Sequence, residues 1–564
     1  MRYRLIGFSH LRHLRETPHS ARAVTWIIFT LMKKLKSKER TNRAALGRWS
    51  ASLMIAAATQ TLVLPSLHAT TPKMEITDSG ITIAVEDGLT RAKGLLPNDV
   101  DVSTSQGIVT LSGSVENLPA KERAIMTAKS VRGVTEVIDQ LTVYALARPD
   151  DEIRADIQSA LKQDPATMSY QTTVAVHDAV ATLTGTVGSY AEQQLATRIA
   201  SGVKGVKAVH NQIKINYLAA GTDDEISAAV KSRLQWDVWV NGDLITPVVK
   251  DGKVTLSGTI GGSISKSRAF DDAWVNGVTS VDDSGLKIEP WTHNGTTQNG
   301  YRANLSDSDI QQAVQAALRA DPRVSAFKPD VTVADGIVTL RGVVGNMKAE
   351  TSAEQDAKNI VGVSKVETHL KVRAISIASG AEATALADAS IKLKAALAWD
   401  PWLDSATIDV AVINHVAYLS GGVESSFQKA EAQDVASRTA GVLEIRNNLK
   451  IQPYFSASDY YSDYDYYSDY DYGYYDWPYY NESPYYIADM SGPQQYKTDA
   501  KIKKSIEDRF IWSPFVDRND IKVTVNGGVA TLTGSIGTWV GWGEAEKDAH
   551  KGGASFVVDT VKVD

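Results

Sequence analysis

The chain contains no cysteine among its 564 residues. Without thiols it can form no disulfide, no thiolate metal site, no cysteine nucleophile and no acylated N-terminal cysteine. It also lacks an uninterrupted apolar run of about 20 residues, the length that a helix needs to cross a bilayer. The length exceeds what a single core accommodates, so the sequence predicts several packed domains.

Motifs that support catalysis are missing as well. The glycines never form a phosphate-binding loop that ends in Lys-Ser or Lys-Thr, and neither Gly-x-Ser-x-Gly nor His-Glu-x-x-His occurs. The aspartates of residues 459–471 lack the glycine and glutamate of an EF-hand loop. We therefore predict that the protein is not an enzyme and has no catalytic, cofactor-binding or metal-binding residues. The histidines of the body are scattered, at His177, His210, His293, His369, His415 and His550.

Positive charge is scarce outside the N-terminus. Residues 1–69 contain 12 Lys and Arg against two Glu, which leaves 47 basic and 64 acidic residues, a net charge of −17, in the rest of the chain. An acidic body is repelled at long range by nucleic acids and by anionic lipid. This balance argues against nucleic acid as a partner and against simple charge-driven attachment to a membrane.

Residues 1–69 have the composition of an export signal region. Basic residues precede an apolar run within residues 50–69, and Ala69 offers a cleavage site. Met32, which two lysines follow, is a second candidate for the true start of the chain. The alternative is an uncleaved anchor, but polar residues interrupt the run before it reaches the length of a membrane span.

Twelve glycines divide the rest of the chain into six similar stretches. In each, one glycine closes an apolar segment and a second follows 19 or 20 residues later. The glycine pairs are Gly113 and Gly133, Gly185 and Gly205, Gly258 and Gly277, Gly342 and Gly362, Gly421 and Gly441, and Gly534 and Gly553. Every pair encloses two alanines four residues apart, such as Ala353 and Ala357, which share one face of a helix. We interpret these alanines as packing residues that let the helix lie close on a sheet.

Residues 331–342 are the clearest copy of a β-hairpin. Asp335-Gly336 is a typical type I′ turn sequence, because glycine accepts a positive φ without steric cost and aspartate tolerates it. The pairing that this turn sets puts four apolar side chains on one face of the hairpin. The predicted facing pairs are Val333 with Val338 and Val331 with Leu340.

The turns of the other copies vary. Asp251-Gly252 and Asn526-Gly527 keep the type I′ sequence. His177-Asp178 and Asn414-His415 do not, and we expect a different or bulged loop at those two places.

An amphipathic helix precedes each hairpin, with apolar residues every four positions and acidic residues at its start, where capping and the helix dipole favour them. A short strand follows the second helix. The sequence therefore predicts an α+β protein of six tandem αββαβ units, each a three-stranded mixed sheet covered by two helices. We expect the units to form a beaded chain. Their ranges are 76–145, 150–217, 223–290, 305–373, 383–452 and 497–564.

A tract at residues 453–496 separates the last two units. Its segment 454–490 holds 14 of the 22 tyrosines and eight carboxylates but no Lys or Arg. With almost no aliphatic residues it cannot form a packed core, so we predict a disordered Tyr/Asp-rich spacer.

This pattern resembles the BON domain, named for bacterial osmotically induced and nodulation proteins. The resemblance rests on the acidic helix start, the Asp-Gly hairpin, the strand that ends in Leu-x-Gly, and a Gly-Val pair before the last strand, as at Gly362-Val363. Trp-Asp-Pro-Trp at residues 399–402 is also similar to the family. The sixth unit departs from the pattern with Gly552-Gly553-Ala554. The resemblance implies a non-catalytic periplasmic or envelope protein, linked to osmotic or envelope stress, that binds phospholipid or another envelope surface.

Paired tryptophans after the first helix are the best candidates for an interaction. One interpretation is that Trp236, Trp399 and Trp512 cap the core beneath the helix. The other is that Trp239, Trp402, Trp539 and Trp542 reach a membrane surface or a partner, since indole suits a surface that is apolar on one side and wet on the other. Two functions remain open on the sequence: a peripheral phospholipid binder, and a structural spacer or scaffold that binds envelope proteins.

Overall fold

The computed structural model describes residues 76–92, 94–95, 99–217, 221–290, 305–373, 382–451 and 498–563. The predicted export signal region with Met32 and the predicted Tyr/Asp-rich spacer lie outside these residues. The repeats are called units 1 to 6 in chain order. No helix in the described ranges is long and apolar enough to cross a membrane.

Each unit has the predicted order of helix, hairpin, helix and strand. Unit 1 consists of α2 (Asp78–Arg91), β1 (Val100–Ser105), β2 (Ile108–Val115), α3 (Leu118–Lys129) and β3 (Glu136–Val143). Unit 2 consists of α4 (Asp150–Gln163), β4 (Gln171–His177), β5 (Val180–Val187), α5 (Tyr190–Ser201) and β6 (Ala208–Ile215). Unit 3 consists of α6 (Asp223–Trp236), the 3-10 turn η2 (Gly242–Leu244), β7 (Ile245–Lys250), β8 (Lys253–Ile260), α7 (Ser263–Asp272) and β9 (Ser280–Ile288).

The last three units repeat this order. Unit 4 consists of α9 (Asp307–Ala320), β10 (Asp330–Ala334), β11 (Ile337–Val344), α10 (Met347–Lys358) and β12 (Lys365–Val372). Unit 5 consists of α11 (Glu382–Trp399), η3 (Ser405–Thr407), β13 (Ile408–Ile413), β14 (Val416–Val423), α12 (Ser426–Arg438), β15 (Glu444–Asn447) and β16 (Lys450–Ile451). Unit 6 consists of α13 (Asp499–Trp512), β17 (Ile521–Asn526), β18 (Val529–Ile536), α14 (Trp539–Lys551), β19 (Phe556–Asp559) and β20 (Lys562–Val563).

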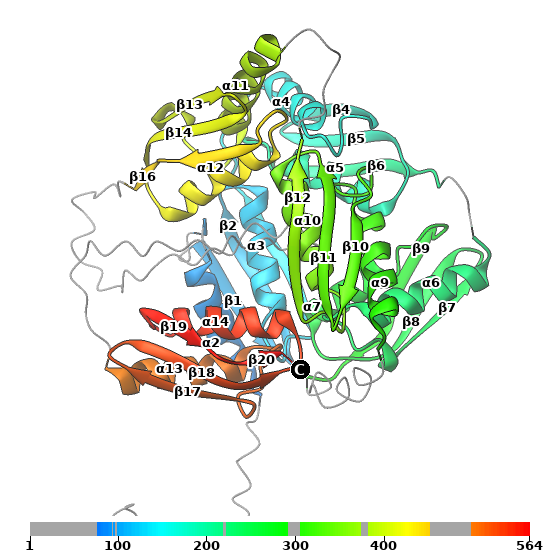
Figure 1. Cartoon of the computed structure of the whole chain (residues 1–564), viewed down its shortest axis with the longest axis vertical. Coiled ribbons are helices and arrows are strands. Elements are labelled where there is room, and N and C mark those ends of the chain that lie inside the picture. The colour runs from blue at the N-terminus through cyan, green and yellow to red at the C-terminus, as the bar shows by residue number, and fades with distance from the viewer. Residues whose placement is uncertain are drawn as a thin grey trace, which may run out of the picture. The chain divides into compact units, whose positions relative to one another are not determined.

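The second strand of each unit is the centre of its sheet. In unit 4, β10 pairs antiparallel and β12 pairs parallel with β11, and both helices cover one face of the sheet, as Figure 1 shows. The hairpin has the predicted register, with Val333 opposite Val338 and Val331 opposite Leu340. The α+β prediction of mixed three-stranded sheets is therefore confirmed. In units 5 and 6 the last strand is interrupted, and both of its pieces pair with the central strand.

The prediction of unusual hairpin loops in units 2 and 5 is wrong. Asp178 and Ala179 have φ values of 51° and 64°, and Asn414 and His415 have 50° and 65°, so both hairpins turn through two left-handed residues as unit 4 does. In unit 6 the two left-handed residues are Gly527 and Gly528, one position later than the predicted Asn-Gly pair.

A carboxylate at the start of the first helix explains the turn of unit 2, and four other units share this arrangement. In five units the first helical residue is an aspartate whose two oxygens accept hydrogen bonds of 2.8 to 3.0 Å from both main-chain N–H groups of the turn. The aspartates are Asp78, Asp150, Asp223, Asp307 and Asp499. These charge-assisted bonds favour the turn even where glycine is absent, since they stabilise the conformation that presents both donors to one acceptor.

The predicted alanine stripe is buried in every unit. All twelve alanines, among them Ala353 and Ala357 of α10, are 0% exposed. In five units the first glycine of the pair lets the two strands of the hairpin lie close, because a Cβ atom on Gly185, for example, would lie 2.0 Å from the carbonyl oxygen of Gln171 in β4. Alanines between helix and sheet and glycines between strands therefore allow close packing at fixed places.

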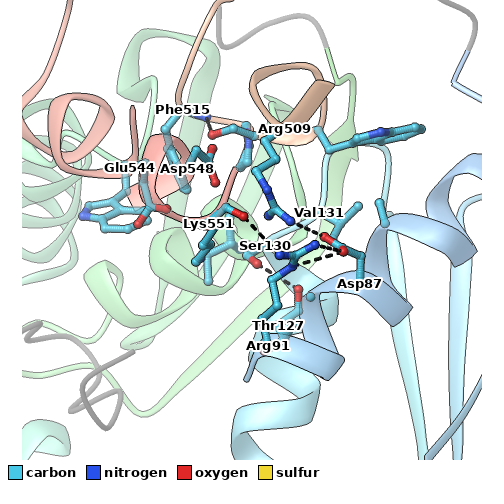
Figure 2. A pocket seen from close by; sticks show the side chains of 17 residues that line it. Asp87, Arg91, Thr127, Ser130, Val131, Arg509, Phe515, Glu544, Asp548 and Lys551 are labelled. Carbon is cyan, nitrogen blue, oxygen red and sulfur yellow. Dashed lines mark hydrogen bonds and ion pairs between the residues drawn. The ribbon is translucent and has the colours of Figure 1, made fainter. Parts of the chain in front are cut away.

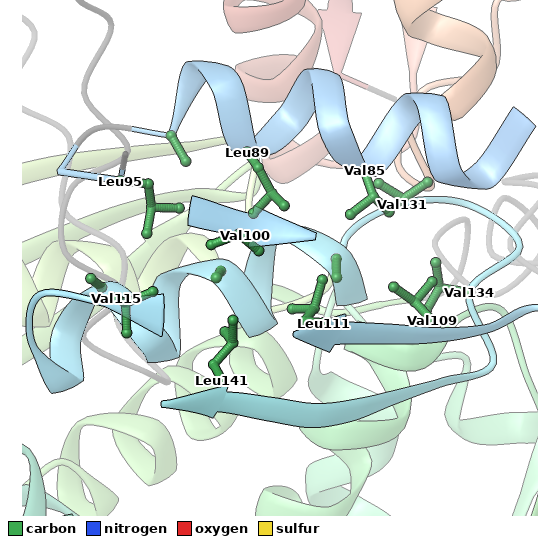
Figure 3. Close-up of a cluster of buried hydrophobic side chains, with 14 of the residues drawn as sticks. Val85, Leu89, Leu95, Val100, Val109, Leu111, Val115, Val131, Val134 and Leu141 are labelled. Carbon is green, nitrogen blue, oxygen red and sulfur yellow. The ribbon is translucent and has the colours of Figure 1, made fainter. Parts of the chain in front are cut away.

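Each unit has its own hydrophobic core, illustrated for unit 1 in Figure 3. Val85 and Leu89 of α2 point at Val109 and Leu111 of β2, which are fully buried between the helices and the sheet. The opposite face of the sheet carries no helix of its own unit.

Candidate functional site

Two of the four tryptophans that the sequence marked as interaction residues, Trp239 and Trp402, contact other units. Trp239 is 5% and Trp402 is 8% exposed, so the interpretation that they reach a membrane surface is wrong. Trp402 belongs to unit 5 but packs in the core of unit 1. Trp542 is half-buried against the core of its own unit, and the side chain of Trp539 lies outside the described part of the chain.

The capping interpretation is correct only in part. Trp399 packs against the core of unit 2, and Trp512 packs against the core of unit 1. Trp236 packs against its own core and against that of unit 4. These indoles therefore join one unit to another, which hydrophobic periodicity within a single unit cannot reveal.

A main-chain hydrogen bond repeats at all three of these tryptophans. The residue before the second glycine of one unit donates its N–H to the tryptophan carbonyl oxygen of another, and this is called the Trp-carbonyl contact below. Its donors and acceptors are Arg132 and Trp512 at 3.0 Å, Lys204 and Trp399 at 2.6 Å, and Val361 and Trp236 at 2.9 Å. The contact pairs unit 1 with unit 6, unit 2 with unit 5, and unit 3 with unit 4.

Side chains strengthen two of the three Trp-carbonyl contacts. The Arg132 guanidinium donates to the carbonyl oxygen of Val516 at 3.2 Å, and the Lys204 ammonium donates to that of Leu403 at 2.9 Å. Val516 and Leu403 each lie four residues after the tryptophan. Unit 4 has Val361 at the equivalent position, and it is buried in the core of unit 3.

A second set of contacts uses the residues after the first helix. Trp239 of unit 3 packs edge-on against Phe515 of unit 6, with ring centroids 4.5 Å apart. The guanidinium of Arg123 in unit 1 lies 4.9 Å from the centroid of the Trp402 ring of unit 5. The buried Arg323 of unit 4 forms a 3.0 Å ion pair with Asp164 of unit 2.

These contacts overturn the expectation of a beaded chain. Main-chain hydrogen bonds, shared cores and buried ion pairs link units that are distant in the sequence. The described residues of the six units therefore belong to one compact body.

A cavity of about 110 Å³ lies where units 1, 3 and 6 meet (Figure 2). Its lining includes the aromatic rings of Trp239, Trp512 and Phe515. Its charged groups are Asp87, Arg91, Arg509, Glu544, Asp548 and Lys551. A smaller cavity of about 70 Å³ occupies the equivalent place between units 2 and 5, beside Trp399.

Ion pairs neutralise much of the charge in the larger cavity. The Asp87 carboxylate pairs with Arg91 of its own helix and, at 2.8 Å, with Arg509 of unit 6. Burial alone would raise the pKa of Asp87, but the two guanidinium groups outweigh it and lower that pKa. Arg91 also donates to the carbonyl oxygen of Lys551 at 3.1 Å. The charges of unit 1 are thus matched to those of unit 6.

Burial shifts the pKa of two groups of α14. Burial raises the pKa of Asp548 to about 6, against the opposing effect of Lys551 and Arg509. Burial lowers the pKa of Lys551 to about 8, although Asp548 and Glu544 act in the other direction. Sequence reasoning missed this cluster because its members are brought together only by the packing of separate units.

The structure assembles no metal centre within the described ranges. They contain no group of three or more His, Asp and Glu side chains placed to hold a metal ion. His177 and His415 lie at hairpin turns, as expected, and the His415 ring nitrogen Nδ1 lies 2.9 Å from the carbonyl oxygen of Gly441.

The uncovered face of the sheets is a second candidate surface. In five units the last strand carries an exposed lysine next to a buried residue on the helix side, as Lys371 beside Leu370 shows. The lysines are Lys214, Lys287, Lys371, Lys450 and Lys562. In unit 4 the exposed Arg341 and His369 lie on the same face, because they are partners across the parallel pair of strands. Each lysine stands between two aliphatic residues, as in Leu370-Lys371-Val372. Sequence reasoning missed this pattern, and the register of each sheet shows which face the lysine occupies.

Repeated αββαβ units with one helical layer and one open sheet face define the architecture of this protein. A comparison with protein families finds the BON domain in six stretches, residues 77–145, 149–217, 222–290, 306–374, 387–453 and 498–564. Because these stretches cover more than half of the chain, the protein belongs to the BON domain family.

One curated relative is the osmotically-inducible protein Y of Escherichia coli (strain K12). It is 37% identical over 144 residues, which are 24% of this chain and 72% of the relative. Two solved structures of CdsD, a structural protein of the type III secretion system of Chlamydia trachomatis, each match 38% of this chain and 100% and 96% of their own. Their sequence identity is 13% and their TM-score is 0.11, so this likeness carries no argument.

Proposed function

We propose that the protein is a non-catalytic, peripheral protein of the periplasm that binds phospholipid surfaces through the uncovered faces of its sheets. The observation that carries the proposal is the exposed lysine at the same position of five last strands. An ammonium group near an anionic membrane contributes about 1 kcal/mol, so one lysine is weak but several on one chain add up. The osmotically inducible relative supports a role in osmotic or envelope stress.

This mode of binding fits the net charge of −17 that residues 70–564 carry. Long-range attraction to anionic lipid is absent, so binding must come from local contacts of the sheet faces. The indoles contribute little, because Trp239 and Trp402 are buried between units. Exposed apolar side chains of the same sheets, such as Phe556 at 61% exposure, add contact area at the membrane interface.

Liposome flotation of the exported chain tests the proposal. We expect flotation with vesicles of phosphatidylglycerol and phosphatidylethanolamine, less with neutral phosphatidylcholine vesicles, and loss after the five sheet lysines are replaced by alanine. The matched control replaces five exposed lysines of the first helices, Lys162, Lys231, Lys394, Lys501 and Lys503, and loses the same charge. Equal flotation of the two variants would reject the sheet faces as the binding surface. No flotation with either lipid, together with capture of one specific envelope protein, would favour the scaffold function.

A further inference from the structure

The contacts between units follow the two halves of the chain. Units 1 to 3 are called the first half, and units 4 to 6 the second half. All three Trp-carbonyl contacts cross between the halves. The contacts of Trp239 with Phe515, Arg123 with Trp402, and Arg323 with Asp164 cross as well.

Each unit of the first half thereby contacts two units of the second half. Unit 1 contacts units 6 and 5, unit 2 contacts units 5 and 4, and unit 3 contacts units 4 and 6. The contacts combine main-chain hydrogen bonds, buried indoles and ion pairs, which together define one orientation of the first half on the second half.

Contacts within a half hold its own units together. Tyr190 of unit 2 stacks on Trp274 of unit 3, with ring centroids 4.4 Å apart. The Lys129 ammonium of unit 1 donates to the Ser267 hydroxyl of unit 3 at 2.9 Å. In the second half, the buried Lys348 of unit 4 pairs with Asp434 of unit 5 at 3.0 Å. Unit 6 is held by its contacts with units 1 and 3 of the first half.

We propose that the two halves are complementary binding partners, and that the first half of one copy also engages the second half of another copy. The reason is chemical identity: a second copy offers the same tryptophan carbonyls, indoles and ion-pair partners in the same arrangement. Exchange of identical elements between copies costs little, because every contact broken within one chain is remade between two. The interface between the halves therefore fits a second copy of the chain. This proposal does not depend on lipid binding by the sheet faces.

The test uses the full chain with a protease recognition sequence inserted within residues 291–304, between the halves. After cleavage, we expect the two halves to elute together in size-exclusion chromatography at the position of the uncut protein. When cut unlabelled protein is mixed with cut ¹⁵N-labelled protein, native mass spectrometry is expected to show mixed pairs of one light and one heavy half. In uncut protein incubated at high concentration, exchange is expected to give a dimer. Separation of the halves on cleavage would overturn the proposal, and so would an absence of mixed pairs and dimer.

Charge-reversal variants of an ion pair between the halves supply the control. Asp87→Arg places three cations together, and Arg509→Asp places an anion opposite Asp87. Each single variant removes the ion pair between the halves and should accelerate the formation of mixed pairs about tenfold. The double variant restores opposite charges and should return most of the original rate. A variant that misfolds is not rescued by a second substitution. Failure of the double variant to differ from the two single variants would contradict the assigned interface.

Discussion

The main-chain N–H of Lys204 donates a 2.6 Å hydrogen bond to the carbonyl oxygen of Trp399, which belongs to a unit on the other side of the chain's midpoint. The same bond recurs between Arg132 and Trp512 and between Val361 and Trp236. A tryptophan at the end of the first helix therefore marks a unit whose carbonyl group accepts the hydrogen bond, and a unit without this tryptophan donates the N–H group. The sequence difference between units 3, 5 and 6 and units 1, 2 and 4 is a difference in docking role.

Replacing Trp402 with alanine should loosen unit 1 more than unit 5. The side chain is 8% exposed and packs against the core of unit 1, so its removal leaves a cavity there at a cost of about 3 to 5 kcal/mol. We expect hydrogen exchange to accelerate in α2 and β2, with a smaller effect in β14. Phe556→Ala, at an exposed aromatic residue, serves as the control. Faster exchange confined to unit 5 would show that Trp402 does not belong to the core of unit 1.

Asp307→Ala should destabilise the hairpin of unit 4. The substitution removes the acceptor of two hydrogen bonds from the turn, at a cost of about 1 to 3 kcal/mol. Amide exchange at Asp335 and Gly336 is the direct measurement. Asp330→Ala removes the same charge from an exposed strand position and should leave those amides protected. Similar exchange in the two variants would mean that the carboxylate does not stabilise the turn.

Ala269→Leu should destabilise unit 3 by about 1 to 3 kcal/mol, because the larger side chain has no space between helix and sheet. Ala269 is 0% exposed, whereas Ala229 in the first helix of the same unit is exposed. Ala229→Leu should therefore change stability by less than about 0.5 kcal/mol. Urea denaturation followed by NMR signals of unit 3 compares the two variants. An equal loss from both would argue against close packing by the alanine stripe.

The contacts between units should weaken as pH rises from about 4 to about 7. Burial raises the pKa of Asp548 to about 6, and it raises that of Asp400 to about 6 as well. A carboxyl group with a raised pKa binds its proton more tightly in the folded state, so its contribution is fully present below the ordinary pKa of about 4 and is lost as pH rises through the raised value.

For each such group, the free energy of unfolding should fall by up to about 1.4 kcal/mol per pH unit within that range. Asp548→Asn should remove part of this slope. The charged groups that act on the pKa of Asp548 are Lys551, Arg509, Glu544 and Lys547. Chemical denaturation at several pH values measures the slope, and an unchanged slope in the variant would contradict the role of Asp548.

Much of the fold could be predicted because it depends on local patterns. The glycine spacing, the alanine pairs and the hairpin around Asp335 each fix a local geometry, and the register follows from the alternation of apolar residues. The turns at Asp178 and Asn414 were mispredicted because the sequence of a turn does not show that a carboxylate binds its amides in one case, or that His415 contacts Gly441 in the other.

The candidate surfaces were harder to foresee. Trp402 has the same sequence signature whether it faces a membrane, its own core or another unit, because indole suits all three environments. The choice depends on which units meet, and the contacts of Trp402 lie in unit 1, far away in the sequence. The lysines of the last strands do share a sequence pattern, a lysine between two aliphatic residues. Only the register of the sheets shows that all five lie on the uncovered face.

The Trp-carbonyl contacts are nested in the sequence, so a chain that is made from its N-terminus can form them only one after another. The partner of unit 3 is made first, that of unit 2 next and that of unit 1 last, so these contacts become available in this order. Trp512, near the end of the chain, completes the packing around the unit that was made first. A product that terminates before unit 6 therefore leaves the surface of unit 1 that packs against Trp512 uncovered.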